Sequence, residues 1–145
     1  MNILDVSIVL FIIMESANVC ILYFFPDSRK GNGVAAFNEW EESKKNEDSH
    51  LFASYMASWV AGVKLIFILL LVVILFTNDE TTKILGVVVM ILSIASYFWK
   101  LRPIIGELDR RGKITPKGYS KALNLMIIGM ISMFTIALIS HLAFF

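Results

Sequence analysis

The chain has almost none of the residues that build disulfides and metal centres. It contains one cysteine, Cys20, and two histidines among its 145 residues. Cys20 lies in an apolar run and has no second cysteine with which to form a disulfide or share a metal. A Glu-x-x-His spacing occurs once, at Glu47 and His50, whereas a di-iron bundle uses that motif twice with two further carboxylates. The sequence therefore predicts no metal site, no cofactor and no catalytic residues.

A strong excess of one charge is also lacking. The 13 Lys and Arg residues and 12 Asp and Glu residues leave a net charge of +1. The basic residues gather in loops and offer no basic face, which argues against nucleic acid as a partner. Hydrophobic residues make up 57% of the chain, and the mean hydropathy is +0.73. This composition predicts an all-α integral membrane protein with a single domain over residues 1–145.

The longest apolar run covers residues 51–76 and reads LFASYMASWVAGVKLIFILLLVVILF, with Lys64 as its one charged residue. As a helix it would rise about 39 Å, more than the hydrocarbon core of a bilayer at about 30 Å. Three further apolar segments cover about residues 3–25, 84–101 and 119–142. The short connection at 77–83 makes the second and third segments antiparallel neighbours. We therefore expect four antiparallel transmembrane helices in an up-down bundle within the lipid bilayer.

The basic residues predict the topology of this bundle. Eleven of the 13 lie in the loops between helices one and two and between helices three and four. Cytoplasmic loops carry an excess of Lys and Arg, so both long loops should be cytoplasmic and both termini outside the cell membrane. The first apolar segment has no Lys or Arg ahead of it, carries Asp5 and lacks a small-x-small cleavage site. We expect it to remain as a helix rather than to act as a signal peptide.

The first loop, residues 26–50, allows two interpretations. Residues 34–45 can form a short helix on the membrane surface, with Phe37 and Trp40 facing lipid and four charged side chains facing water. The alternative is a solvated, charged loop. A turn signal, Gly31-Asn32-Gly33, precedes this segment.

The second loop is predicted to form a cytoplasmic helical hairpin. The helical pattern continues past Pro103 to Arg111, and Gly112 suits the left-handed residue that ends such a helix. Thr115 is then expected to cap the next helix, with Pro116 at its first position and Ile114 packed on Tyr119. The pattern Leu108-x3-Gly112-x-Ile114-Thr115-x3-Tyr119-x-Lys121-x-Leu123 resembles the short helical hairpin found at the C-terminal ends of many bacterial proteins. This resemblance covers a short stretch and implies a hairpin, not an activity.

Ionisable and polar residues recur at one depth of the predicted bundle. Glu15 and Lys64 each lie twelve residues from the outer end of their helix, and a charge at that depth needs a partner or a wet cavity. The predicted midplane polar site consists of Glu15, Asn18, Lys64, Ser93, Tyr97, Ser132 and Thr135. It serves either as a device that fixes helix register or as an ion or proton site.

Small residues follow two rows at spacing four along the second helix. The rows are Ala53, Ala57, Ala61 and Ser54, Ser58, Gly62. Small side chains allow close approach of another membrane helix, so this face is the predicted contact for a membrane protein partner or for a homo-oligomer.

Three classes of function fit these features. The first is a non-catalytic membrane component, such as an accessory, scaffold or regulatory subunit. The second is a small ion- or proton-coupled transporter or channel that uses Glu15 and Lys64. Small multidrug transporters resemble the chain in a glutamate of helix one, but this chain has larger loops, a lysine in helix two and no glycine-rich third helix. The third is a lipid-acting membrane enzyme, although the arginine-rich and asparagine-containing signature of glutathione-transferring membrane enzymes is absent.

Overall fold

The computed structural model describes residues 2–144, and every regular element in that range is helical. The elements are α1 (Ile3–Phe24), the 3-10 helix η1 (Val34–Ala36), α2 (Asn38–Ser43), α3 (Glu47–Phe76), α4 (Glu80–Ala95), α5 (Tyr97–Arg110) and α6 (Tyr119–Phe144). Four segments are long and apolar enough to cross a membrane, namely α1, α3, the combined α4 and α5, and α6. The all-helical fold and its four membrane-length helices therefore agree with the sequence prediction.

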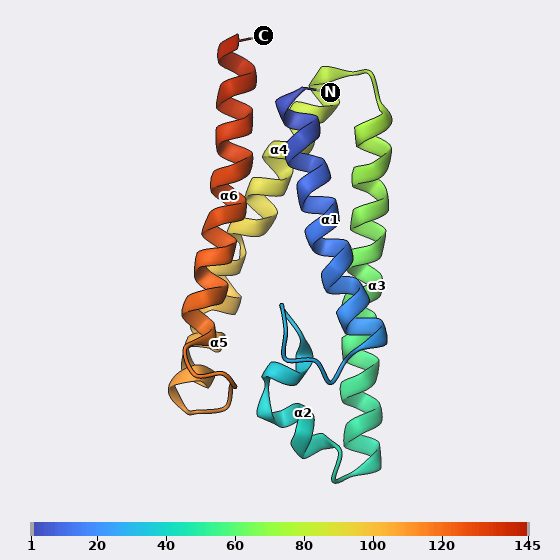
Figure 1. Ribbon diagram of the computed structural model, residues 1–145, viewed down its shortest axis with the longest axis vertical. Helices are drawn as coiled ribbons and strands as arrows, with labels where there is room; N and C mark the ends of the chain where they lie inside the picture. Colours follow the sequence, from blue (N-terminus) through green and yellow to red (C-terminus); the bar gives the residue numbers. More distant parts are fainter. Residues whose placement is uncertain (1, 145) are drawn as a thin grey trace.

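The long helices lie along the long axis of the molecule (Figure 1). α1 packs against α3 and α6, and α4 packs against α6. Both termini and the connection between α3 and α4 lie at one end, called the terminal end here (Figure 1). The opposite end, called the loop end, carries α2 and the connection between α5 and α6 (Figure 1). α1 thus occupies a central position with neighbours on both sides.

Three clusters of buried apolar side chains hold the helices together. The largest joins all four membrane-length segments, through Leu4, Ile8, Phe11, Leu71, Val87, Met90, Met130, Phe134 and Ala137. Phe134 is fully buried, and its ring centroid lies 5.4 Å from that of Phe11. A second cluster lies around Tyr97, Ile114 and Tyr119, and a third joins α1 to α3 through Val19, Leu22, Ala61 and Ile68.

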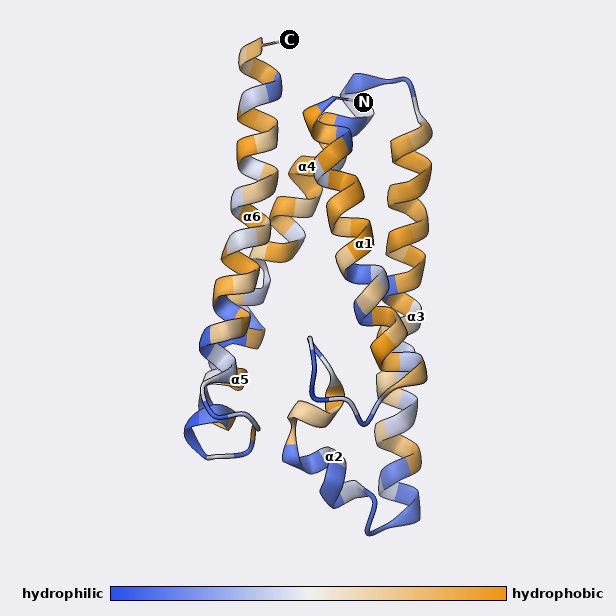
Figure 2. Cartoon of the chain, viewed as in Figure 1, coloured by the Kyte–Doolittle hydropathy of each residue, from blue (hydrophilic) through white to orange (hydrophobic). Residues whose placement is uncertain are grey.

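The outer surface of the helices is strongly apolar. Orange, hydrophobic ribbon covers most of the long helices, whereas blue, hydrophilic ribbon gathers at the loop end and in the α3–α4 connection at the terminal end (Figure 2). In α3, 17% of the most apolar window is buried inside the protein, and Phe76 is 80% exposed. Soluble monomers rarely expose apolar patches of this extent. The surface therefore matches a lipid environment better than water.

Side-chain caps explain where the helices begin. Asn2 and Asp5 form a reciprocal capping box on α1, with both N–H to oxygen distances at 2.9 Å. Asn46 accepts from Ser49 N–H at the start of α3, and Asp79 accepts from Thr82 N–H at the start of α4. These caps make α3 and α4 begin four residues earlier than the apolar segments predicted at 51 and 84.

The third membrane-length segment is two helices with a break at Ser96. The Ser96 hydroxyl donates to the carbonyl oxygen of Ser93 at 2.6 Å, a local bond that competes with regular helix geometry. α5 then continues through Pro103 to Arg110, and Gly112 follows with a φ of +70°. The predicted extension past Pro103 and the left-handed glycine are therefore confirmed.

The predicted cap of the last helix is wrong. α6 begins at Tyr119 rather than at Pro116, and the carboxylate of Asp109 accepts hydrogen bonds from the N–H groups of Gly118 and Ser120, both at 3.0 Å. Thr115 instead faces the first loop, where its hydroxyl donates to Oδ1 of Asn38 at 3.0 Å. Asp109 can cap α6 because the glycine turn brings the end of α5 beside the start of α6.

The prediction for residues 34–45 is only partly correct: short helices form there, but Trp40 is buried against protein instead of facing lipid, and the alternative of a solvated, charged loop is wrong. The segment forms η1 and α2, and it is hydrogen-bonded to the α5–α6 connection. Asn38 N–H donates to the carbonyl oxygen of Lys113 at 2.9 Å, and Thr115 N–H donates to that of Ala36 at 2.8 Å. These backbone bonds give the two loops a shared, ordered structure at the loop end.

The position of the Trp40 side chain differs most clearly from the prediction. Its side chain is buried, with 3% exposed, and the indole N–H donates to Oδ1 of Asp27 at 2.7 Å. Its ring lies 5.0 Å from that of His50. Phe37 packs edge-on against Tyr119, with 6.3 Å between ring centroids. Both aromatic side chains therefore contact protein where the sequence predicted contact with lipid.

Candidate functional site

Glu15 and Lys64 form an ion pair between the middle of α1 and the middle of α3. Lys64 Nζ donates to Glu15 Oε2 at 2.6 Å, and the two side chains are 25% and 15% exposed respectively. Within a bilayer, a single charge at the middle of a helix costs about 2.5 to 3.5 kcal/mol on insertion scales, and pairing would offset much of that cost for both residues. The structure therefore brings together two residues of the predicted polar site, Glu15 and Lys64.

Asn18 lies one helical turn from Glu15 and faces the same interior. The residue is 8% exposed, and neither Nδ2 nor Oδ1 of its side chain has a hydrogen-bond partner among the described residues. Leaving a buried polar group without a partner costs about 1 to 3 kcal/mol. Buried polar groups in native folds are nearly always hydrogen-bonded, so a bound molecule that hydrogen-bonds to Asn18 would explain its lack of a protein partner.

The first loop turns back toward this site. Gly31 has a φ of +62°, and a Cβ built on it would lie 3.2 Å from Cδ1 of Ile21 and 4.0 Å from Nδ2 of Asn18. The tip of the loop therefore reaches alongside the last turns of α1, and it rises between α1 and α6 (Figure 1). A glycine is needed here because any side chain would meet α1 in a strained backbone conformation.

Asn32 at this loop tip is a residue that the sequence analysis interpreted only as part of a turn. The Tyr119 hydroxyl of α6 donates to Asn32 Oδ1 at 2.7 Å. Irregular backbone at membrane depth is tolerated where protein covers it or where it lines a cavity. The Gly31-Asn32-Gly33 sequence was the one available signal for this turn, but it does not tell where the turn lies.

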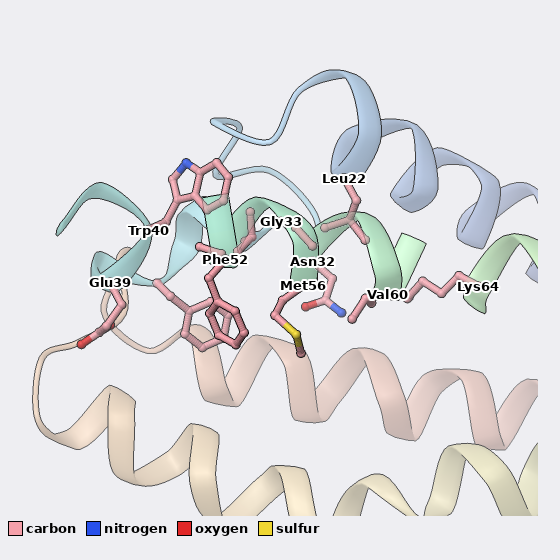
Figure 3. A pocket seen from close by; sticks show the side chains of 13 residues that line it. Leu22, Asn32, Gly33, Glu39, Trp40, Phe52, Met56, Val60 and Lys64 are labelled. Atoms are coloured by element: carbon pink, nitrogen blue, oxygen red, sulfur yellow. The ribbon is translucent and has the colours of Figure 1, made fainter. Parts of the chain in front are cut away.

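A cavity of about 190 Å³ lies beside the ion pair. Its polar wall is formed by Glu15, Asn18, Asn32 and Lys64, and its apolar wall by Met14, Ala17, Ile21, Gly31, Met126, Ile127 and Met130. A groove of about 410 Å³ shares Asn32 and Lys64 with it and follows α3 toward the loop end. The groove is largely apolar, with Leu22, Trp40, Phe52, Met56 and Val60 among the side chains around it (Figure 3).

The other residues of the predicted polar layer lie elsewhere. Ser93 and Ser132 are exposed on the outside of their helices, and the Thr135 hydroxyl donates to the carbonyl oxygen of Ile131 within α6 at 2.8 Å. Tyr97 is buried, but its hydroxyl donates to Asn124 Oδ1 at 2.7 Å and joins α5 to α6. Equal depth along a helix does not determine which way a side chain faces, and these four residues do not join the Glu15 cavity.

A second ion pair between helices was missed by the sequence analysis. Lys83 Nζ of α4 lies 2.7 Å from Asp5 Oδ1 of α1, and both side chains are 11% exposed. Asp5 in an otherwise apolar run and Lys83 as the one basic residue of its connection were the available signals. This pair ties the terminal ends of α1 and α4 together.

The small-residue rows of α3 face partly inward. Ala57 and Ala61 are 7% and 0% exposed, and a Cβ on Gly62 would lie 3.3 Å from the hydroxyl oxygen of Tyr23. Ala53 lines the groove, Ser54 is half-buried and Ser58 is exposed. Small side chains thus allow close approach of α1 within this chain, and only the Ser54 and Ser58 edge remains accessible to another helix.

Clusters of three or more His, Cys, Asp or Glu side chains with metal-binding geometry do not occur within residues 2–144. His50 Nδ1 lies 3.1 Å from Ser43 Oγ, but that hydroxyl donates to the carbonyl oxygen of Trp40 at 2.7 Å. The contact links the end of α2 to the start of α3 and does not resemble an activated nucleophile.

Fold and site together define an all-helical protein with four membrane-length helices and one ion-paired polar cavity between them. Comparisons with protein-family models, with curated proteins and with solved structures found no match.

Proposed function

We propose that the chain is a non-catalytic component of the cell membrane, in the manner of an accessory, scaffold or regulatory subunit. The observation that carries this proposal is the Glu15–Lys64 pair, at 2.6 Å between α1 and α3. An ion pair between two helices favours one pairing and one register of those helices. This role is structural and involves no catalysis. The Asp5–Lys83 pair acts in the same way between α1 and α4.

The proposal includes four antiparallel spans with both termini outside. Arg29, Lys30, Lys44 and Lys45 lie in the first loop, and Arg110, Arg111, Lys113 and Lys117 lie in or next to the α5–α6 connection. The preference of Lys and Arg for the cytoplasmic side supports a cytoplasmic loop end. The exposed apolar surface of the long helices supports insertion.

A membrane partner is proposed to contact the accessible edge of the small-residue face. Ser54 and Ser58 lie on α3 outside the groove, and Ser58 is exposed. Small polar side chains at such an edge permit a close helix–helix contact with hydrogen bonds across it. A second copy of this chain or another membrane protein would both satisfy this contact.

Transport is a second candidate function, and the unpartnered Asn18 beside the ion pair favours it. A carboxylate in a polar cavity at mid-membrane is a typical site for a coupled proton or cation. No comparable observation favours a lipid-acting enzyme, because the described residues bring no nucleophile together with a free general base.

Reconstitution into liposomes separates these two candidates. We expect wild-type protein to move protons and monovalent cations no faster than protein-free liposomes under a pH gradient or a membrane potential. Glu15→Gln should leave that baseline unchanged. A flux that appears with wild-type protein and disappears in Glu15→Gln would overturn the component proposal in favour of transport.

A further inference from the structure

The cavity and the groove adjoin each other beside the Glu15–Lys64 pair. They share Asn32 and Lys64, and their volumes are about 190 Å³ and 410 Å³. Small-molecule sites commonly occupy about 300 to 1,000 Å³ and combine apolar walls with a few convergent polar groups. Glu15, Asn18, Asn32 and Lys64 supply polar groups at one end, Glu39 lies at the other end near Trp40, and the wall between them is mainly apolar (Figure 3).

The polar end holds hydrogen-bonding capacity that the protein does not use. Asn18 is 92% buried, and both its donor and its acceptor lack partners among the described residues. Asn32 uses its carbonyl oxygen for Tyr119, and Glu15 uses Oε2 for Lys64. A ligand group that both donates and accepts hydrogen bonds would complement Asn18 directly.

The charge of the site argues for an uncharged ligand. Glu15 and Lys64 already neutralise each other at 2.6 Å. A further net charge at this depth would bear the insertion cost of about 2.5 to 3.5 kcal/mol without a counter-ion. Hydroxyl groups supply a donor and an acceptor without that cost.

The groove indicates that the ligand comes from the bilayer. It runs along α3 from Lys64 to Phe52, about 18 Å at 1.5 Å per residue. Phe52 and Val60 on its wall are 65% and 42% exposed, and Figure 3 shows Phe52, Met56 and Val60 directed into the space beside α3. An apolar chain fits this wall, and a membrane-soluble molecule can reach it sideways.

We propose that this space binds an uncharged, hydroxyl-bearing lipid of the monoacylglycerol type. The headgroup lies against Asn18 beside the Glu15–Lys64 pair, and the acyl chain follows the groove toward Trp40. Bound headgroup hydroxyls supply the partners that Asn18 lacks. The proposal does not depend on whether the chain transports ions or serves as a membrane component.

Trp40 provides a direct probe, because it lines the groove and is 3% exposed. Trp59→Phe and Trp99→Phe leave Trp40 as the one tryptophan, and both replaced residues are exposed, at 57% and 78%. This protein, in phosphatidylcholine nanodiscs, is titrated with a monoacylglycerol whose chain carries bromine. We expect saturable quenching of Trp40 emission that unbrominated monoacylglycerol reverses.

Two variants test the two ends of the site. Asn18→Leu removes the headgroup contacts and should raise the half-saturating concentration about tenfold. Ala53→Phe fills the groove and should abolish saturable quenching. The matched Val63→Phe, at a position of the same helix that is 52% exposed and outside the groove, should leave it unchanged. Circular dichroism melts confirm that each variant is folded.

Three outcomes would overturn the proposal. Non-saturable quenching, equal for brominated phosphatidylcholine and brominated monoacylglycerol, would mean that bulk acyl chains enter the groove without headgroup recognition. Absence of quenching by every brominated lipid would mean that the groove is closed or that another protein chain covers it. Equal saturation by the brominated free fatty acid at neutral pH would remove the selection for an uncharged headgroup. The competition with unbrominated lipid needs no change at the site, so it decides the matter even if a site variant fails to fold.

Discussion

Lys64 of α3 donates to Glu15 of α1 at 2.6 Å, although 49 positions separate the two residues in the chain. The pair lies at mid-height of both helices, and the unpartnered Asn18 and the re-entrant Asn32 line the cavity beside it. This contact fixes α1 against α3 and leaves a polar cavity next to the two mutually neutralising charges.

Removal of either charge should destabilise the bundle. We expect Glu15→Gln and Lys64→Met each to lower the free energy of unfolding by about 3 kcal/mol, because the remaining charge is left buried without a partner. The double variant should recover much of the loss. Thermal unfolding in detergent measures all three. Additive single effects would show that the two side chains do not interact in the folded protein.

An exposed pair supplies the control for that experiment. Lys45 lies 2.7 Å from Glu42, but the two side chains are 72% and 63% exposed. Exposed ion pairs contribute about 0 to 1 kcal/mol, so Lys45→Met should barely change the unfolding temperature.

The Asp5–Lys83 pair should behave like the Glu15–Lys64 pair. Its two side chains are each 11% exposed. Lys83→Met should therefore cost about as much as Lys64→Met and more than Lys45→Met. An unfolding temperature for Lys83→Met that matches the Lys45→Met control would mean that the pair contributes nothing to stability.

Docking of the two loops should depend on Asn38. Its side chain donates to the carbonyl oxygen of Gly112 at 3.0 Å and accepts from the Thr115 hydroxyl at 3.0 Å. Asn38→Ala should accelerate hydrogen exchange at the Thr115 amide, by roughly tenfold for a loss of about 1.4 kcal/mol. Asn78→Ala, in the exposed connection at the terminal end, is the matched control and should change nothing there. Equal exchange rates at the Thr115 amide in both variants would show that the Asn38 side chain does not stabilise the contact between the two loops.

The Trp40 environment should respond to pH through Asp27. Hydrogen bonds from Lys44 and from the Trp40 indole hold the pKa of the Asp27 carboxyl below its usual value of 3.8. A depressed pKa stabilises the folded loop above pH 3.8, and this contribution is lost as the pH falls through the lower, folded value. Emission of Trp40 as the single tryptophan should therefore change with a midpoint below pH 3.8. Asp27→Asn should remove this acid transition, and a transition that persists unchanged in Asp27→Asn would show that Asp27 is not its source.

Membrane topology is accessible to cysteine labelling. In a Cys20→Ala background, cysteines at Ser43 and Lys113 should resist impermeant thiol reagents in intact cells, while one at Asn78 should react. All three positions lie outside the membrane-length helices. Labelling of Ser43 or Lys113 from outside would reverse the orientation that the basic loops predict.

The four membrane-length helices follow from the sequence alone. Long apolar runs, such as residues 51–76 and 119–142, favour an apolar environment regardless of how the rest of the chain packs. Helix starts after Asn46 and Asp79 are equally local, since each capping side chain and the N–H that donates to it lie three residues apart, although the hydropathy pattern placed both starts four residues too late. The common depth of Glu15 and Lys64 could also be counted along the chain.

Tertiary structure decided which of these residues meet. Ser93 and Ser132 share the depth of Glu15 but face outward, because rotation about a helix axis depends on packing against neighbours. The return of the Gly31 loop to α1, the capping of α6 by Asp109 and the burial of Trp40 all join residues through contacts between separate elements. The periodicity of the sequence shows which face of its own helix a residue lies on, but not which neighbouring helix that face meets. Side-chain contacts across the bundle depend on how all the helices and both loops pack at once, and so the cavity beside Asn18 appears only in the folded chain.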